Sequence, residues 1–410
     1  MSRAAALSVF VLLITSTSLV AQQAAIRANG IIESQQTGFR FPDGTIQSTA
    51  ATVTGGVPSV NGIAGAVTIV GNGGNTVSTA SGTITVAGPY KRTLVVSPVP
   101  NNPTASGTAL LNALASITTN SATNRYLLKL EPGIYDLGPN QLVMKSYVDI
   151  EGSGQSVTRI EGARGTGETE TSFVDAAAIR GASVSELRQL TVVNTSSNMY
   201  GFGYAANGAT DTRLSDVTLH AVGALVAPIG LFLENAGVDA SGLTIVAKTA
   251  LQGSGGIYIS GASAAIRLSR STMEVQAGEG SSGTGFTLAQ GATAMIDSCT
   301  IVVEGGTSHT TGVMVNVGSA TMTNSTVRVS GAPDRKGVAT ISNAASAIDI
   351  HDSRIIVGSV WNSFDVLALS KGTGSQLRAY STLTDSASLG APVCILTYSY
   401  TGTTSCPNPS

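Results

Sequence analysis

Short segments in which apolar and polar residues alternate recur along most of this chain, about every 27 residues. Most of them open on a serine followed by residues that favour strands. A period this short, with glycine and serine between strand-like pieces, is typical of a solenoid in which each repeat buries its apolar face against its neighbours. The aligned pentads are 188–192, 215–219, 241–245, 271–275, 298–302, 325–329 and 353–357.

Each repeat has two further parts. A glycine or aspartate precedes a second alternating strand, and a third short strand, such as 265–269 or 347–351, completes the repeat. No 3.6-residue period crosses these segments, which excludes a helical solenoid. We therefore predict an all-β, right-handed parallel β-helix with about three strands per coil of about 27 residues. The second-strand landmarks are Gly201, Gly230, Gly256, Gly285, Gly312, Gly337 and Asp365.

The first strand of each repeat separates inward from outward side chains. Its third and fifth places, such as Val217 and Leu219, are mostly apolar and are predicted to point inward. The outward row between them contains Glu274 and Arg328, which are candidate ligand-binding residues two coils apart. A separation of about 10 Å is too wide for a hydrogen-bonded pair. The row reads Thr191, Thr218, Thr244, Glu274, Ile301, Arg328, Ile356.

The second strand places two aromatic residues, Phe232 and Tyr258, next to each other on its outward row. Rings on adjacent coils lie about 5 Å apart and could stack against sugar rings or a partner surface. In the alternative interpretation, a loop of the same chain covers them. The row reads Gly203, Phe232, Tyr258, Thr287, Met314, Ala339, Leu367.

One segment, residues 105–117, has helical spacing of its apolar residues. Thr108 or Ser106 is the expected N-cap. A helix just before a solenoid is expected to cover the open apolar end of the first coil. The apolar face consists of Leu110, Leu111, Leu114 and Ile117.

Two segments after this helix carry recognisable motifs. Residues 126–137 contain ProGlyIleTyr, and residues 144–162 contain GluGlySerGly and close on ThrArgIleGluGly. Together they resemble the opening coils of the pectate-lyase and pectinesterase-like superfamily of right-handed parallel β-helices. The resemblance implies a fold without a mechanism, because the catalytic motifs of pectinesterases, polygalacturonases and pectate lyases do not occur in the chain. Trp361, for example, is not followed by the AspHis pair of pectate lyases.

Composition narrows the functional classes. Only 11% of the residues are charged, 42% are hydrophobic and the net charge is −2. Such a chain is too apolar to be disordered and lacks the positive field that attracts nucleic acid.

The ends of the chain suggest export and an attachment segment. Residues 1–21 have the layout of a secretory signal peptide, and no later segment could span a bilayer as a helix. Residues 22–90 form a Gly/Thr-rich stalk or linker that contains short β segments, 91–393 the β-helix and 394–410 a tail. Within the stalk, the stretches 38–50 and 59–70 resemble segments of exported and phage-tail-like proteins. That resemblance implies a possible homotrimer through residues 22–90, whereas a flexible linker is the alternative.

Three cysteines in an exported chain suggest one disulfide and one free thiol. Cys394 and Cys406 lie close together in sequence, and a bridge between them would contribute about 3 kcal/mol by the loop-entropy model. Cys299 occupies a place in the repeat where no histidine lies near, so we interpret it as an unpaired structural residue.

The sequence offers few candidate metal ligands. Asp297, Asn324 and Asp352 are aligned at the corner before the first strand and could bind calcium, although Asx side chains also cap tight turns. No cofactor is expected, with calcium as a possibility. The three histidines, His220, His309 and His351, are interpreted as incidental, because no Ser, Asp or Glu was found at a matching place to orient them.

Two functional hypotheses remain. The first is a non-catalytic β-helix, secreted or displayed at the cell surface, that binds a polysaccharide or surface glycan. The second is a polysaccharide-active lyase, esterase or hydrolase with non-standard catalytic residues from loops. Candidates are Glu168, Glu170, Asp334, Arg335 and Lys336.

Overall fold

The computed structural model describes residues 88–167, 172–248, 251–341, 345–358 and 365–384, and outside them the backbone of short strands. The chain divides into two compact units, Met1–Val70 and Gly71–Ser410. In the first unit, β1 (Phe39–Arg40) pairs with β2 (Ile46–Gln47), and β3 (Ser59–Val60) with β4 (Ile63–Ala64), all antiparallel. The predicted signal peptide lies outside the described residues. The predicted domain boundaries and the homotrimer stay predictions.

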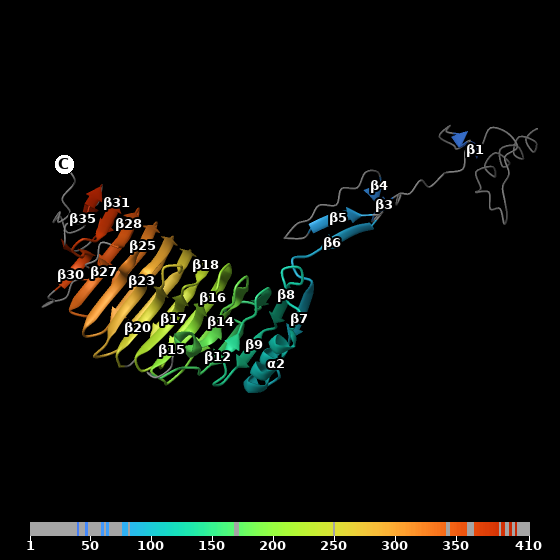
Figure 1. Cartoon of the computed structure of the whole chain (residues 1–410), viewed down its shortest axis with the longest axis horizontal. Coiled ribbons are helices and arrows are strands. Elements are labelled where there is room, and N and C mark those ends of the chain that lie inside the picture. The colour runs from blue at the N-terminus through green and yellow to red at the C-terminus, as the bar shows by residue number, and fades with distance from the viewer. Residues whose placement is uncertain are drawn as a thin grey trace, which may run out of the picture. The chain divides into compact units, whose positions relative to one another are not determined.

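The second unit opens on an antiparallel hairpin of β5 (Thr76–Ala80) and β6 (Thr83–Ala87) and continues as a solenoid with three parallel walls. In Figure 1 its strands lie side by side from β7 and β8 to β31. Each coil contributes one strand to sheet C, one to sheet A and one to sheet B, in that order along the chain. The predicted right-handed parallel β-helix is confirmed.

Strands that lie in more than one wall bend at a corner. Sheet C contains β7 (Arg92–Val96), β8 (Tyr126–Leu130), β11 (Val148–Glu151), the first parts of β14 (Glu186–Asn194) and β16 (Thr212–Val222), β18 (Gly237–Ser241), β21 (Ala265–Ser269), the ends of β23 (Ser282–Asp297) and β25 (His309–Thr323), β28 (Ser346–His351), β31 (Gln376–Tyr380) and β34 (Val393–Ile395).

The other two walls are built in the same way. Sheet A contains β9 (Gly133–Asp136), β12 (Thr158–Gly162), the ends of β14 and β16, β19 (Thr244–Lys248), β22 (Thr272–Ala277), β24 (Thr300–Gly305), β26 (Thr326–Val329), β29 (Arg354–Val357), β32 (Leu383–Thr384) and β35 (Tyr398–Ser399). Sheet B contains β10 (Leu142–Val143), β13 (Ala177–Arg180), β15 (Tyr200–Asn207), β17 (Ala227–Glu234), β20 (Gly253–Ser260), the starts of β23 and β25, β27 (Asp334–Thr340), β30 (Asp365–Lys371) and β33 (Ala387–Leu389).

From β14 onward, a single residue with left-handed backbone turns the chain from sheet C to sheet A in each coil. Successive members of this row are 26 to 29 residues apart, which is the true repeat of the molecule. A short side chain or one that bonds locally tolerates this conformation best. The row reads Gln189, Asp216, Gly242, Arg270, Ser298, Asn324, Asp352 and Ser381.

This row corrects the predicted alignment of the first strand, which was anchored on serines. Ser298 is itself the left-handed residue, whereas Ser271 follows the left-handed Arg270. Met273 therefore pairs with Ile301, and Ile301 points inward and is fully buried rather than outward. The other predicted inward residues are confirmed, since none is more than 2% exposed: Val217, Leu219, Leu243, Ile245, Met273, Val275, Val327, Val329, Ile355 and Val357.

A column of small residues on sheet B faces the branched side chains of sheet A. A Cβ atom added at Gly312 would lie 2.1 Å from Cγ1 of Val327 and 2.5 Å from the carbonyl oxygen of Gly337. Two predicted landmarks were wrong, because Gly201 pairs with Pro228 and Asp365 with Asp334, outside this column. The column, named the glycine column below, is Gly203, Gly230, Gly256, Gly285, Gly312, Gly337 and Ala368.

The predicted helix is α2 (Pro103–Ser116). Its N-cap is Asn102, whose side chain accepts a hydrogen bond from the backbone N–H of Ala105, so the expected caps Ser106 and Thr108 were wrong. Both lie inside the helix, where their hydroxyls donate to backbone carbonyls one turn earlier. The helix packs on β9, with Leu110, Leu114 and Ile117 buried; its role as a cap stays a prediction.

Cys299 is a free, buried thiol, as predicted. The corrected register aligns it with Ser271 and Ser325, whose hydroxyls point into the same corner of neighbouring coils. Burial raises the pKa of the Cys299 thiol to about 11. The side chains of Cys394 and Cys406 lie outside the described residues, so their disulfide stays a prediction.

The glycine column predicts a large difference between two Gly→Ala variants. Gly312→Ala should lower the free energy of unfolding by about 1–3 kcal/mol or more, because the methyl group overpacks the gap between sheets A and B. Gly237→Ala is the matched control, since a Cβ there meets no atom within 4 Å. Denaturant unfolding of both variants measures the difference, and equal midpoints would contradict the proposed close packing.

The thiols give a second prediction. Native protein should resist alkylation at pH 8, because the Cys299 thiol is buried and its pKa of about 11 leaves almost no thiolate. Unfolded, unreduced protein should expose one reactive thiol, and unfolded, reduced protein three. Intact-mass measurement counts the adducts. Rapid alkylation of native protein would refute the buried environment, and three adducts without reductant would refute the disulfide.

Candidate functional site

The outer face of sheet B carries a distinctive group of outward-pointing side chains. Phe232 and Tyr258 occupy adjacent strands in register, as predicted. The ends of the predicted row were wrong, because Gly203 belongs to the inward column and Leu367 pairs with Lys336. The observed row reads Ala205, Phe232, Tyr258, Thr287, Met314, Ala339 and Ser370.

Three aromatic rings stack along this face. The ring centroids of Phe202 and Phe232 are 4.9 Å apart with an interplanar angle of 12°, and those of Phe232 and Tyr258 are 5.5 Å apart at 3°. Phe173 reaches the same stack from the 3₁₀ helix η1 (Phe173–Ala176), 6.0 Å from Phe232. These residues form an apolar cluster separate from the interior of the solenoid.

The cover from η1 is partial. Phe232 is only 6% exposed, whereas Tyr258 is half-buried and Phe173 is 45% exposed. A hollow of about 350 Å³ remains between them. We name it the aromatic hollow; it is lined by Phe173, Tyr200, Phe202, Ala227, Ile229, Phe232 and Tyr258, with Glu234, Ser260 and Gln290 as polar groups.

A second, larger hollow of about 760 Å³ lies further along the same sheet. In it, Nδ1 of His309 lies 2.8 Å from Oδ2 of Asp334, and Nζ of Lys336 lies 3.2 Å from the same oxygen. The expectation that no Ser, Asp or Glu lies at a place matching His309 was wrong, because the register places Asp334 directly beside it on the next coil. We name this region the polar hollow; its lining includes Ser282, Thr284, His309, Thr311, Asp334 and Lys336.

Sequence reasoning missed several of these residues. Phe202 was hidden by the misassigned landmark at Gly201, and Phe173 lies on a connection that is longer than its counterparts in the next two coils. Residues 163–176 join sheet A to sheet B in this coil, whereas 195–199 and 223–226 do so in the next two. The extra length of that connection was the signal that could have pointed to a covering segment.

The predicted residues on sheet A do not join this site. Glu274 and Arg328 are exposed on sheet A with Val302, rather than Ile301, between them. The carboxylate of Glu274 lies 4.0 Å from Nζ of Lys248. The structure therefore separates the four predicted ligand-binding residues onto two faces, and their role in binding stays a prediction.

The predicted calcium ligands are not aligned as expected. Asp297 pairs with Thr323, one residue before the left-handed row that contains Asn324 and Asp352. Hydrogen bonds from Thr323, Asn324 and Ser298 hold the pKa of the Asp297 carboxyl below its ordinary value. Within the described ranges, no group of three or more His, Cys, Asp or Glu side chains could hold a metal. Calcium binding stays a prediction.

Most of the ion pairs on sheet C lie on its early coils. Tyr90 donates a 2.7 Å hydrogen bond to Asp149, and burial raises the pKa of Tyr90 to about 12. Lys129 lies 2.6 Å from Glu151, whose other oxygen accepts a bond of 2.7 Å from Nε of Arg188. These partners satisfy one another, which indicates a structural network.

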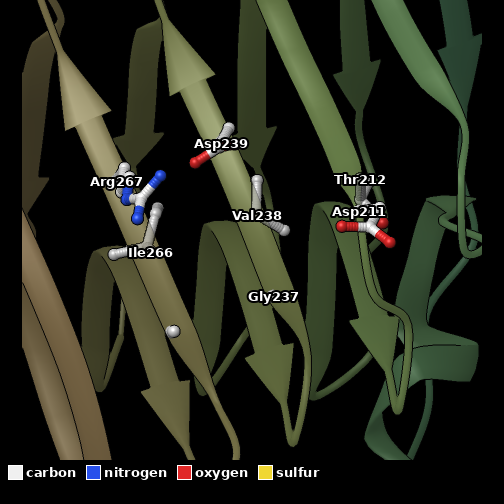
Figure 2. A pocket seen from close by; sticks show the side chains of 8 residues that line it. Asp211, Thr212, Gly237, Val238, Asp239, Ile266 and Arg267 are labelled. Carbon is white, nitrogen blue, oxygen red and sulfur yellow. The ribbon is translucent and has the colours of Figure 1, made fainter.

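Figure 2 shows a smaller pocket, of about 200 Å³, on the same wall. Asp239 on β18 and Arg267 on β21 are in register on adjacent strands, and Asp211 lies in the turn before β16. The pocket is smaller than the two hollows of sheet B and has no aromatic lining. It therefore offers less to a ligand than the two hollows of sheet B.

Comparisons with known proteins concern the fold alone. No family model and no curated protein matches the chain. Among solved structures, pectin methylesterase PemA from Erwinia chrysanthemi is 12% identical, with 79% of this chain and 94% of that chain covered and a TM-score of 0.41. The A-module of a mannuronan C-5 epimerase from Azotobacter vinelandii is 13% identical, with 78% of this chain and 100% of that chain covered and a TM-score of 0.38. A protein of Geobacillus virus E2 is 10% identical, with 80% of this chain and 66% of that chain covered and a TM-score of 0.41.

The three parallel walls and their register from coil to coil are those of a right-handed parallel β-helix. This confirms the fold implied by the opening coils at 126–162. In the part of the chain that the structure describes, no helix has the length and apolar character needed to cross a membrane.

The network on sheet C predicts how stability depends on acid. Burial alone would raise the pKa of Glu151, but the bonds from Lys129 and Arg188 outweigh it and hold that pKa below its ordinary value. A carboxyl with a lowered folded pKa stabilises the fold above its unfolded pKa, and this contribution is lost as the pH falls. Glu151→Gln should therefore flatten the loss of stability between about pH 5 and pH 3.

Urea unfolding at several pH values measures this effect. Glu279→Gln, at an exposed position, is the control and should keep the pH dependence of the unmodified protein. If Glu151→Gln lost stability between about pH 5 and pH 3 as steeply as the unmodified protein, the assigned ion pairs would be contradicted.

Proposed function

We propose that the protein is a glycan-binding β-helix, secreted or displayed at the cell surface, whose ligand lies in the aromatic hollow. The observation that carries this proposal is the ring stack of Phe202, Phe232 and Tyr258, partly open beside the exposed Phe173. Sugar rings present apolar C–H faces that pack on aromatic rings, so a partly uncovered stack of this kind suits them.

The polar groups of the hollow fit the same ligand. Glu234, Ser260 and Gln290 supply a carboxylate, a hydroxyl and an amide beside the aromatic rings. A sugar hydroxyl both donates and accepts hydrogen bonds, and these groups match both needs. The volume of about 350 Å³ lies within the range of about 300–1,000 Å³ that is usual for ligand pockets.

The proposed export and surface display are supported by the signal-like residues 1–21, and the proposed polysaccharide partner is supported by the aromatic hollow. The scarcity of charge favours a neutral glycan over a polyanion.

A polysaccharide-active enzyme is the second candidate. Its specific support is the pair of His309 and Asp334, with Lys336 beside them. Asp334, Arg335 and Lys336 were the sequence candidates for this function, and they lie on β27 rather than in a loop. Arg335 is fully buried, while Glu168 and Glu170 lie outside the described residues.

A glycan array followed by calorimetric titration tests binding. Tyr258→Ala and Phe173→Ala should each weaken binding of the best glycan about tenfold, because each removes one stacking face. Met295→Ala is the control, since Met295 is an exposed apolar residue on sheet C, 57% accessible. Failure to bind any arrayed glycan, or full affinity in Tyr258→Ala, would overturn the proposal.

A further inference from the structure

We propose that the polar hollow is a carboxylic-ester hydrolase site in which Ser282 is the nucleophile, His309 the general base and Asp334 the residue that orients His309. This inference is independent of glycan binding in the aromatic hollow, because none of its three residues lines that hollow.

The parallel register lines up the three side chains. Ser282, His309 and Asp334 are the first residues of β23, β25 and β27, which are adjacent strands of sheet B. His309 pairs with Asp334, and the residues after Ser282 and His309 pair with each other. Adjacent strands are about 4.8 Å apart, so a serine and a carboxylate flank the imidazole on opposite sides along the axis.

Asp334 fixes the imidazole for this role. Its Oδ2 lies 2.8 Å from Nδ1 of His309, so a proton on Nδ1 is held toward the carboxylate and Nε2 keeps its lone pair. Asp334 is 22% exposed and His309 66%, which places the carboxylate beneath a ring that an incoming substrate can reach. A neutral imidazole with a free Nε2 is the base that a serine hydroxyl requires.

Ser282 is available to react. Across the described part of the chain, its Oγ makes no hydrogen bond, and the residue is partly exposed at the rim of the same hollow. Rotation of the Ser282 side chain can bring its hydroxyl toward Nε2 while His309 keeps its bond to Asp334, since catalytic hydrogen bonds are often loose without substrate.

An ammonium group and two threonine hydroxyls line the same hollow. Nζ of Lys336 lies 3.2 Å from Asp334, and Thr284 and Thr311 line the hollow beside it. An ammonium and hydroxyl groups can stabilise the oxyanion that forms when a carbonyl is attacked. An ester fits this arrangement better than a glycosidic bond, because glycosidases need a pair of carboxylates.

The reaction balances with water as the only co-reactant. Oγ of Ser282 bonds to the ester carbonyl carbon while its proton moves to Nε2 of His309. The carbon–oxygen bond to the alcohol then breaks, and the alcohol leaves with that proton. Water attacks the acyl-serine, gives a proton to His309, and releases the carboxylic acid as Ser282 takes the proton back.

Two measurements test the site on the full chain. The first is hydrolysis of p-nitrophenyl acetate; Ser282→Ala, His309→Asn and Asp334→Asn should each lower kcat/KM about 100-fold or more. The second is the intact mass after exposure to a fluorophosphonate, with one adduct per chain that peptide mapping places on Ser282. His309→Asn should slow the labelling by a similar factor.

Controls separate this outcome from loss of structure and from glycan binding. His351→Asn removes an imidazole that stacks on Tyr380 at 4.5 Å on sheet C and should leave both readouts unchanged. Tyr258→Ala should also leave ester hydrolysis unchanged. Circular dichroism confirms that each variant is folded. Hydrolysis that persists in Ser282→Ala, an adduct on another residue, or no hydrolysis above that of His309→Asn would overturn the proposal.

Discussion

The constraint that recurs from coil to coil is the close packing between the backbone of the glycine column and the branched side chains of sheet A. A methyl group at Gly230 would lie 2.2 Å from Ile245, and the same holds at Gly337 with Ile355. Sheets A and B can therefore approach until backbone meets side chain, and the interior between them has no room for water. Because each coil contacts only the coils before and after it, this fit repeats along the solenoid and holds the three walls in register.

A filled interior leaves only outward positions and connections for function. Sheet C uses its outward side chains for ion pairs that satisfy one another, as between Lys129 and Glu151. Sheet B instead presents accessible groups: rings that are only partly covered, and the exposed imidazole of His309 beside Asp334. The two hollows lie on one face because the same alternation that buries Leu231 and Leu233 turns Phe232 outward.

The period and the strand alternation were sufficient to predict three strands per coil and the buried faces, because both depend on local pattern and on burial. Register was harder to obtain. Serines occur at three successive places around the corner, as Ser241 before Gly242, Ser298 itself and Ser271 after Arg270 show. The serine-based alignment therefore slipped by two residues between Thr244 and Glu274, and by one further residue that turned Ile301 outward. The pairing of His309 with Asp334 depends on that register across 25 residues, which explains why sequence reasoning missed it. The cover by Phe173 depends on tertiary folding of one connection and has no periodic signal.

The covering segment belongs to a connection, residues 163–176, that is longer in this coil than the links in the following coils. The strands on either side of this connection are hydrogen-bonded to the next coil, because β12 pairs with β14 and β13 with β15. Parts of the connection are nevertheless tied to the walls, since Val174 and Ala176 are fully buried and Gln141 donates a hydrogen bond to the carbonyl oxygen of Val174. Its exposed positions, such as Phe173, can change with the least disturbance. Divergent copies of such a solenoid could acquire new recognition properties by changing these exposed positions, in the way that antibodies vary loops on a constant framework.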